Sequence, residues 1–506
     1  MTKATGPDGV SARVLRECAA VLTPSLSSLF RTSLNLGQLP ADWKHGRIIA
    51  FHKGGKKDDP FNYRPISLLP IASKVLETII NRRLRSFLDE HGLLPDTQFG
   101  FRKNRSTLDM SVSLTQHLSD ALDRGEEARI VSLDLSSAFD RVWHRGLLAK
   151  LEACGVAGDL LIWLSDFLSD RFQTVAVSGQ ESSALPVHAG VPQGSVLGPT
   201  LFLVFLRDMG DGIASHLTFY ADDCTLHRTI SSKGERKSSA MILNNDLATI
   251  HRWAKTWCAR FNASKTHVLT ITRARDASGA HPTLFLENET LSETEQIKVV
   301  GLHLNQRLTW GPHIRNLATR CSQQLGALRR ASFLLPRSAL VAAYKGTIRA
   351  RMEYLSPIWC NGPQTDLQLL HRLQDRALKL CGTEDCTTRQ KLRLQPLQAR
   401  WRTSSLALLH RAFTGVAPPP VCVLLPQPLE QLRRTRASTT SHEHVLTIPR
   451  SRTSHHACSF IPTATRLWNA LPPEAFVDSD PQHQLQRLKT IATYHIFPSS
   501  DSHHTS

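Results

Sequence analysis

The sequence predicts an α+β fold made of more than one folding unit, and three features support that prediction. Residues 128–135 and 216–227 are short apolar runs typical of buried β-strands, and the second run folds back at an acidic turn. Segments with apolar residues at helical spacing precede, interrupt and follow these strands, most densely over residues 313–401. The chain has 506 residues, which is too long for one ordinary domain.

The individual elements follow in chain order from apolar spacing and from turn residues. The expected helices are residues 12–22, 26–36, 67–88, 147–154, 160–168, 202–209 and 243–261, with several more between 313 and 401. The expected strands are residues 47–51, 128–135 and 174–178, and the two strands within 216–227. Three consecutive prolines at 418–420, followed by prolines at 426 and 428, predict a stiff linker.

Positive charge is concentrated in the second half of the chain. There are 61 Lys and Arg residues against 43 Asp and Glu, a formal net charge of +18. Residues 1–300 hold 35 basic and 32 acidic side chains, whereas residues 301–506 hold 26 and 11. An uneven basic excess of this size is typical of proteins that bind a polyanion, most often nucleic acid. General solubility is the alternative, but it does not require the excess to lie in one half.

Composition excludes several other classes of protein. The chain is 41% hydrophobic and 21% charged, which rules out wholesale disorder and fibrous repeats. Its longest apolar run, residues 201–206, is far too short to span a membrane, and its first residues lack the apolar core of a secretory signal. The ten scattered cysteines form no disulfide framework. We therefore expect an intracellular protein, present in the nucleus and the cytoplasm.

Two acidic segments carry the candidate catalytic chemistry. Asp134 ends one apolar run, and Asp222 and Asp223 lie between two others. Alone, each segment has an ordinary explanation, because Asp often begins a helix and adjacent Asp residues often fill a hairpin turn. Together they supply carboxylates from different strands, as a pair of divalent cations requires. Mg²⁺ completes its coordination with water and phosphate oxygens, so the combination indicates in-line phosphoryl transfer.

A third segment, residues 189–199, is a Gly-rich turn that enters an apolar helix. Its small residues let the backbone approach a base pair closely, and the Gln193 amide can donate hydrogen bonds. The segment lacks the Gly-Lys-Ser/Thr ending of a P-loop, so it does not indicate an ATPase.

These three segments resemble motifs of reverse transcriptases, in the form found in jockey-like non-LTR (LINE-type) retrotransposons. The segment with Asp134 resembles the A motif, residues 189–199 resemble the B motif, and the segment with Asp222 and Asp223 resembles the C motif. Residues 3–9, 62–67, 98–107, 262–266 and 298–310 resemble further blocks of that family in the same order, and residues 450–454 and 467–472 resemble its C-terminal segment more weakly. The residues that support the B and C motifs are Pro192, Gly194, Tyr220 and Ala221.

The resemblance implies a right-hand polymerase with fingers, an antiparallel-sheet palm and a helical thumb, and a reverse transcriptase domain at about residues 30–305. The implied parts are N-terminal helices and fingers (1–125), palm with an inserted part of the fingers (126–300), helical basic thumb (301–414), Pro-rich linker (415–432) and a basic segment rich in His and Arg (433–506).

The resemblance also implies the residues that bind metal. Asp134, Asp222 and Asp223 would be the catalytic ligands of two Mg²⁺ ions, for which Mn²⁺ can substitute. The backbone carbonyl of Leu135 would add one more ligand. Lys265 would donate a proton to the leaving pyrophosphate, and the alternative is that it is an ordinary surface lysine.

Four residues would contact the incoming nucleotide. Arg64 and Lys53 would hold its triphosphate, although the neighbouring Lys56 and Lys57 compete with Lys53 for this role. Phe139 would lie under the sugar, unless it is simply packed in the core. Gln193 would contact the template strand or the nucleotide.

The implied function is that of an RNA-directed DNA polymerase, a nucleotidyltransferase that extends a DNA primer on an RNA template with deoxynucleoside triphosphates, away from membranes. A catalytically inactive RNA-binding remnant and a group II intron-type maturase are the alternatives. No zinc knuckle is expected, because Cys381 and Cys386 have no partner pair nearby. Neither an endonuclease nor an RNase H segment is recognisable, so we expect the product of a truncated element.

Overall fold

The computed structural model of the chain describes residues 4–273, 281–383, 385–429, 442–478 and 480–494.

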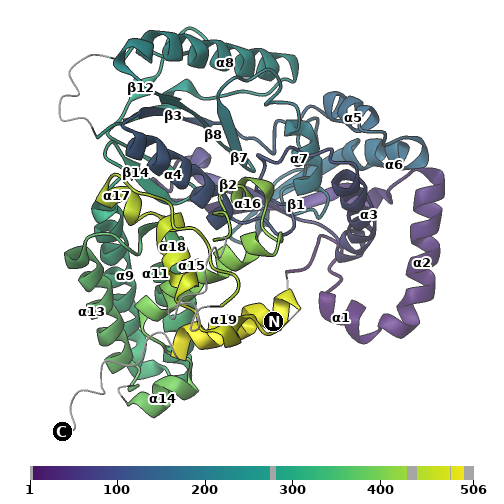
Figure 1. Ribbon diagram of the computed structural model, residues 1–506. Helices are drawn as coiled ribbons and strands as arrows, with labels where there is room; N and C mark the ends of the chain where they lie inside the picture. The colour runs from purple at the N-terminus through teal and green to yellow at the C-terminus, as the bar shows by residue number, and fades with distance from the viewer. Residues whose placement is uncertain (1–3, 274–280, 384, 430–441, 479, 495–506) are drawn as a thin grey trace.

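A five-stranded sheet near the centre of the molecule carries the acidic segments (Figure 1). Its strand order is β12-β9-β3-β8-β7, and every neighbouring pair is antiparallel except the short parallel pair of β12 and β9. The strands are β3 (Glu127–Asp134), β7 (His216–Tyr220), β8 (Asp223–Ile230), β9 (His267–Ile271) and β12 (Ser292–Glu293).

Both faces of this sheet are covered at β3, which explains why buried residues follow one another along this strand instead of alternating with exposed ones. Successive side chains of a strand point to opposite faces. Ile130 and Val131 are both fully buried, yet they belong to two different hydrophobic cores. The sheet therefore separates two cores and holds its acidic end between them.

The first core joins one face of the sheet to the helices of the N-terminal half. Among these helices, α7 is apolar on all sides and almost wholly buried, as expected of a helix inside a core. The helices that contribute to this core are α2 (Ala19–Leu36), α3 (Ile71–Glu90), α5 (His144–Ala153), α6 (Gly158–Leu168), α7 (Gly198–Leu206) and α8 (Arg236–Thr256). The short helix α1 (Ala12–Glu17) precedes them.

A second sheet extends from this half of the molecule. β1 pairs with β2 in antiparallel and with β4 in parallel orientation, and the short strands β5 and β6 both pair with β4. The strands are β1 (His45–His52), β2 (Tyr63–Leu68), β4 (Arg171–Val177), β5 (Gln180–Glu181) and β6 (Leu185–Val187).

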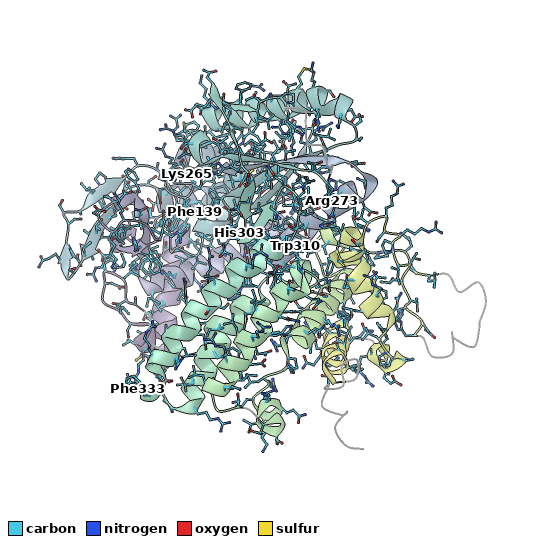
Figure 2. All side chains as sticks on the ribbon, turned by 90° about the vertical axis from the view of Figure 1, so that its left-hand side faces the viewer. Phe139, Lys265, Arg273, His303, Trp310 and Phe333 are labelled. Carbon is cyan, nitrogen blue, oxygen red and sulfur yellow. The ribbon has the colours of Figure 1, made fainter. Side chains whose placement is uncertain are left out.

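The second core joins the other face of the central sheet to α4 (Thr107–Arg124) and to the C-terminal helices. Helix α9 leads away from the sheet, from Trp310 near the palm to the exposed Phe333 at its far end (Figure 2). The hairpin of β10 (Phe285–Leu286) and β11 (Glu289–Thr290) belongs to the first core, through Leu286. The remaining strands and α-helices are β13 (Gln296–Val299), β14 (Leu302–Asn305), α9 (Gly311–Ala331), α10 (Arg337–Ala343), α11 (Ala350–Glu353), α12 (Ser356–Trp359), α13 (Gln364–Leu380), α14 (Cys386–Lys391), α15 (Leu397–Phe413), α16 (Pro419–Cys422), α17 (Ser454–Ala457), α18 (Phe460–Asn469) and α19 (Pro481–Tyr494). A π-helical turn (Tyr344–Arg349) joins α10 to α11.

Most predicted elements are confirmed within a few residues, but the helix predicted at residues 67–88 begins too early. Residues 67 and 68 belong to β2, and α3 begins after Pro70. A proline disfavours the helical conformation in the residue before it, so the helix cannot extend back through Leu69. The helix predicted at 243–261 begins earlier and ends at Thr256, because Cys258 takes a left-handed conformation (φ 57°).

The C-terminal segment packs against the rest of the molecule, where it contacts α4. The segment predicted as a linker contains α16, and Val421 of that helix is buried in the second core. The carboxylate of Asp123 on α4 accepts hydrogen bonds from the backbone N–H groups of Arg452 (2.9 Å) and Thr453 (2.8 Å). The domain limits given above stay a prediction. Within the described ranges, no helix is both long enough and apolar enough to cross a bilayer.

Candidate active site

Three carboxylates lie at one end of the central sheet. Asp134 and Asp223 are paired across the ladder of β3 and β8. Asp222 lies one residue earlier, in the two-residue turn between Tyr220 and Asp223. A turn this tight requires an unusual backbone conformation, and Ala221 provides it with a φ of 57°. The pairing of β3 with β8 thus brings two chain segments, about 90 residues apart in sequence, to one acidic edge.

The electrostatics of this edge fit a divalent cation. Burial, followed by the charges of Asp222 and Asp134, raises the pKa of Asp223. No ion pair within the described residues joins any of the three carboxylates to a basic side chain. The described side chains include no cluster of three or more His, Cys, Asp or Glu that could hold a metal ion, and this holds for the three aspartates as they lie here. Carboxylate oxygens are the ligands that Mg²⁺ prefers, and Mg²⁺ takes further ligands from water and phosphate.

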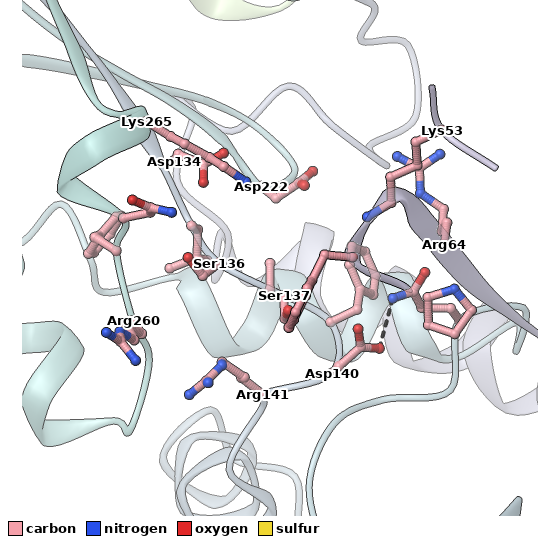
Figure 3. Close-up of a pocket in the computed structure, with 18 of the residues that line it drawn as sticks. Lys53, Arg64, Asp134, Ser136, Ser137, Asp140, Arg141, Asp222, Arg260 and Lys265 are labelled. Atoms are coloured by element: carbon pink, nitrogen blue, oxygen red, sulfur yellow. Dashed lines mark hydrogen bonds between the residues drawn. The ribbon is translucent and has the colours of Figure 1, made fainter. Parts of the chain in front are cut away.

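A cavity of about 1060 Å³ opens beside the acidic edge (Figure 3). It brings together residues predicted from six separate sequence segments. The predicted residues that line it are Lys53, Arg64, Asp134, Leu135, Phe139, Pro192, Gln193, Gly194, Asp222 and Lys265. Three predicted residues do not line it, namely Asp223, Tyr220 and Ala221, which belong to the hairpin behind Asp222.

The basic side of the cavity comes from the second sheet. Arg64 lies on β2 opposite Phe51, and the backbone N–H of Lys53 donates to the Asn62 carbonyl at 2.8 Å. Both side chains are exposed and face the aspartates across the cavity (Figure 3). Lys56 and Lys57 were the alternatives to Lys53 for contact with the triphosphate, and they do not line the cavity. The geometry therefore favours Lys53 as the partner of Arg64.

Phe139 is both a core residue and a wall of the cavity. Its ring stacks on Phe202, with centroids 4.4 Å apart and planes 21° apart. Its other neighbour is Phe101, which meets it edge-on at 6.0 Å. Phe101 is 43% exposed, lines the cavity and has a φ of 54°. No role of its own was predicted for Phe101 from the sequence. In the structure its backbone is left-handed, which is a conformation that a Phe rarely adopts without a structural reason.

Gln193 is fixed by two neighbours. Its side-chain Nε2 donates to Asp140 Oδ1 at 2.7 Å, and its backbone carbonyl accepts from Ser67 N–H at 2.7 Å. A Cβ on Gly194 would collide with the Ser67 carbonyl, so only glycine allows this close approach. The Nε2 side of the Gln193 amide is thus bound to Asp140, which also lines the cavity. Asp140 follows Phe139 directly in sequence, but no role was predicted for it.

A buried glutamate holds the turn that leads into α7. Glu77 on α3 is fully buried, and its Oε2 accepts hydrogen bonds from the backbone N–H groups of Val196 (2.7 Å) and Leu197 (3.2 Å). Burial raises the pKa of Glu77. The sequence analysis missed this residue, because its partners lie about 120 residues away and no local pattern connects them.

Lys265 lies on a short 3₁₀ turn (Ala263–Lys265) that is fastened to β3 by a 2.9 Å hydrogen bond from Asn262 N–H to the Asp134 carbonyl. Its exposed side chain extends toward the aspartates (Figure 3). This position is compatible with contact to a leaving group at the acidic edge.

The central sheet carries paired carboxylates, a basic β-ribbon faces it, and a helical, strongly basic lobe follows it in the chain. This is the architecture of the right-hand polymerase fold. The predicted fold class is thereby confirmed.

Comparison with known proteins identifies the family. Residues 55–304 match the family described as reverse transcriptase (RNA-dependent DNA polymerase). Two Drosophila melanogaster relatives are the probable RNA-directed DNA polymerase from transposon BS and the RNA-directed DNA polymerase from mobile element jockey. The first is 34% identical over 76% of this chain and 43% of the relative, and the second is 31% identical over 75% and 42%. A solved telomerase structure from Candida albicans shows a TM-score of 0.41 and 12% identity over 74% of this chain and 62% of that chain.

Residues 55–304 therefore belong to the reverse transcriptase family, and the chain is similar to the polymerases of jockey-like non-LTR retrotransposons. This confirms the resemblance drawn from the sequence motifs. The chain spans less than half the length of the curated relatives it matches.

Proposed function

We propose that this chain is an RNA-directed DNA polymerase that adds deoxynucleotides to a DNA primer on an RNA template. The observation that carries the proposal is the pairing of Asp134 with Asp223 beside Asp222, at the mouth of a cavity whose opposite side holds Lys53 and Arg64. Carboxylates on one side and cations on the other suit a nucleotide whose reacting phosphate lies between them. The names of the relatives support the same activity.

Each side of the cavity has its own part in this reaction. Asp134, Asp222 and Asp223 would hold two Mg²⁺ ions, or Mn²⁺ in their place, and the Leu135 carbonyl would be a further ligand. When bound, these ions lower the pKa of the primer 3′ hydroxyl and neutralise the charge of the leaving pyrophosphate.

The residues around the metal site bind and orient the nucleotide. Arg64 grips the triphosphate through paired N–H donors, while Lys53 acts as a single positive charge. Lys265 donates a proton to the pyrophosphate. Phe139 lies against the sugar, and the free side of the Gln193 amide contacts the template or the nucleotide. The basic thumb holds the duplex by its phosphates.

The direct test is a primer-extension assay with the purified chain, a DNA primer annealed to an RNA template, deoxynucleoside triphosphates and Mg²⁺. We expect extension that stops when EDTA removes the metal and that returns when Mg²⁺ or Mn²⁺ is restored. Binding of the primer–template without any extension would contradict the proposal and would favour the inactive RNA-binding remnant.

A further inference from the structure

The segment just after α3 runs beside the catalytic hairpin. Phe219 N–H on β7 donates to the Thr97 carbonyl at 2.9 Å, and Phe99 N–H donates to the Phe219 carbonyl at 2.9 Å. Gln98 and Phe219 thus form a parallel bridge at the edge of the central sheet. This short addition to the sheet ends beside the turn that carries Asp222.

The side chain of Gln98 turns inward toward that turn. Gln98 is only 3% exposed, and its Oε1 accepts two backbone hydrogen bonds, from Gly100 N–H at 2.8 Å and from Ala221 N–H at 3.1 Å. Ala221 is the residue with the left-handed backbone, directly before Asp222. Non-glycine residues adopt that conformation at a cost, and the surrounding contacts must hold them there.

The backbone of Gly100 also lies very close to the backbone of Ala221. A Cβ added to Gly100 would collide with the backbone N of Ala221. The absence of a side chain at this position allows residues 98–100 to lie directly against the turn. Together, the Gln98 amide and the Gly100 backbone leave Ala221 little freedom to take another conformation.

We propose that Gln98 is a positioning residue that sets the direction of the Asp222 carboxylate by holding Ala221 in its left-handed conformation. The proposal rests on the function proposed above. Asp222 follows Ala221 directly, so any change in the Ala221 dihedral angles swings its carboxylate away from Asp134 and Asp223. The Gln98 side chain does not touch the nucleotide cavity, and it acts only through the turn.

Gln98→Met tests the proposal, because it keeps the length of the side chain and removes the accepting oxygen. We expect kcat for nucleotide addition to fall by about 10- to 100-fold. We expect KM for the nucleotide to stay within about twofold, since Lys53, Arg64 and Phe139 are untouched. In the metal-free protein, hydrogen exchange at the Ala221 amide should become about tenfold faster.

Two further variants isolate the hydrogen bond from general destabilisation. Gln98→Asn withdraws the oxygen by one methylene and should give smaller shifts in the same two measurements, which covers the case that Gln98→Met does not fold. The matched control is Gln116→Met. Gln116 is also 3% exposed, and its Oε1 also accepts a backbone N–H, from Ile461 at 3.0 Å. This control should lower thermal stability while leaving kcat and Ala221 exchange at the parent values.

Unchanged Ala221 exchange in folded Gln98→Met or Gln98→Asn protein would overturn the proposal, whatever happens to kcat. A higher KM for the nucleotide with an unchanged kcat would also overturn it. The exchange measurement needs no turnover, so it decides the role of Gln98 even if the parent chain proves inactive in primer extension.

Discussion

Phe139 lies between two other aromatic rings, and we propose that this environment lets it select the sugar of the incoming nucleotide. Stacking on Phe202 and edge contact with Phe101 fix the plane of the ring while one side faces the cavity. A rigid flat group under the sugar leaves no room for a 2′ hydroxyl. It can exclude ribonucleotides by a steric clash without improving the binding of deoxyribonucleotides.

Phe139→Val should therefore relax the choice of sugar. We expect incorporation of ribonucleotides relative to deoxyribonucleotides to rise by about tenfold or more. The free energy of unfolding should fall by about 1–3 kcal/mol, because Phe202 loses its stacking partner. Competing kcat/KM values for the two nucleotide types measure the ratio. An unchanged ratio with lower total activity would show that Phe139 only fills the core.

Glu77 gives a prediction about pH at the same scale. Burial raises its pKa above the unfolded value of 4.5, so the folded chain binds a proton more tightly than the unfolded chain does. The stability due to this group is present below pH 4.5 and is lost as the pH rises through the folded pKa. Glu77→Gln still accepts both N–H bonds and does not ionise. Its free energy of unfolding should therefore rise relative to the parent as the pH increases above 4.5.

Urea unfolding of both proteins at several pH values measures this difference. If Glu77→Gln instead lost stability relative to the parent as the pH rose, the ionised carboxylate would be the favoured partner of Val196 and Leu197. Glu77→Ala leaves both N–H groups without their acceptor and should cost about 2–4 kcal/mol below pH 4.5, with a smaller cost relative to the parent as the pH rises.

The residues proposed to bind metal or nucleotide could be predicted from the sequence. The hydrogen bonds that position the loops around them could not. Asp134, Asp222 and Gln193 are found from their own side chains and neighbours in sequence. Glu77 and Gln98 act on backbone N–H groups about 120 residues away, so nothing in their local sequence reveals their partners. Asp140 was adjacent to a predicted residue, but its bond to Gln193 depends on how two loops pack.

At the scale of elements, the strongly patterned helices and the buried strand β3 were predicted, and α4 was missed. Signals for α4 do exist, since Ser106 caps its N-terminus by accepting from Asp109 N–H, and Gly125 ends it in a left-handed conformation. The helix is amphipathic, but it is enclosed on several sides, so polar residues are buried on it together with the apolar ones. The buried polar residues of α4 include Ser111, Thr115, Gln116 and Ser119.

The close approach of the Gly-rich turn to β2 can be tested by Gly194→Ala. Gly54 is a matched control, because its φ of 123° nearly equals the 124° of Gly194 and nothing lies within 4 Å of an added Cβ. Both substitutions carry the backbone strain, but only Gly194→Ala meets the Ser67 carbonyl. We expect Gly194→Ala to cost about 1–3 kcal/mol more than Gly54→Ala in thermal unfolding. Equal losses would show that the turn moves freely away from β2.

For the whole molecule, charge and burial indicate different boundaries. The sequence correctly places the basic excess after residue 300. The second core nevertheless joins the back of the palm sheet, through residues such as Ile130 and Leu269, to the thumb and the C-terminal segment. The docking of that segment on Asp123 uses two backbone N–H groups and the Thr453 hydroxyl, and these partners lie about 330 residues from Asp123 in sequence. One hydrophobic core is therefore shared by the central sheet and the C-terminal helices.

The basic lobe should show its function in the salt dependence of primer–template binding. Arg320 and Arg351 are exposed and line a cavity of about 400 Å³ together with Lys298, whose charge acts on Asp223. Replacing both arginines by Gln should reduce the slope of log affinity against log salt by about 1–2. The same change at Lys233 and Lys237, which are exposed on the first half of the chain, should leave the slope unchanged. Equal slopes for all three proteins would place the nucleic acid elsewhere.

The central claim is that the acidic edge of the sheet performs the polymerase reaction, and Asp222→Asn tests it most directly. The substitution keeps the size of the side chain and removes one metal-binding charge. With an RNA template and Mg²⁺, the rate of primer extension should fall by about a thousandfold or more, while thermal stability and primer–template affinity stay near the parent values. Asp159→Asn, an exposed position on α6, should extend primers at the parent rate. Extension by Asp222→Asn at the parent rate would contradict the account.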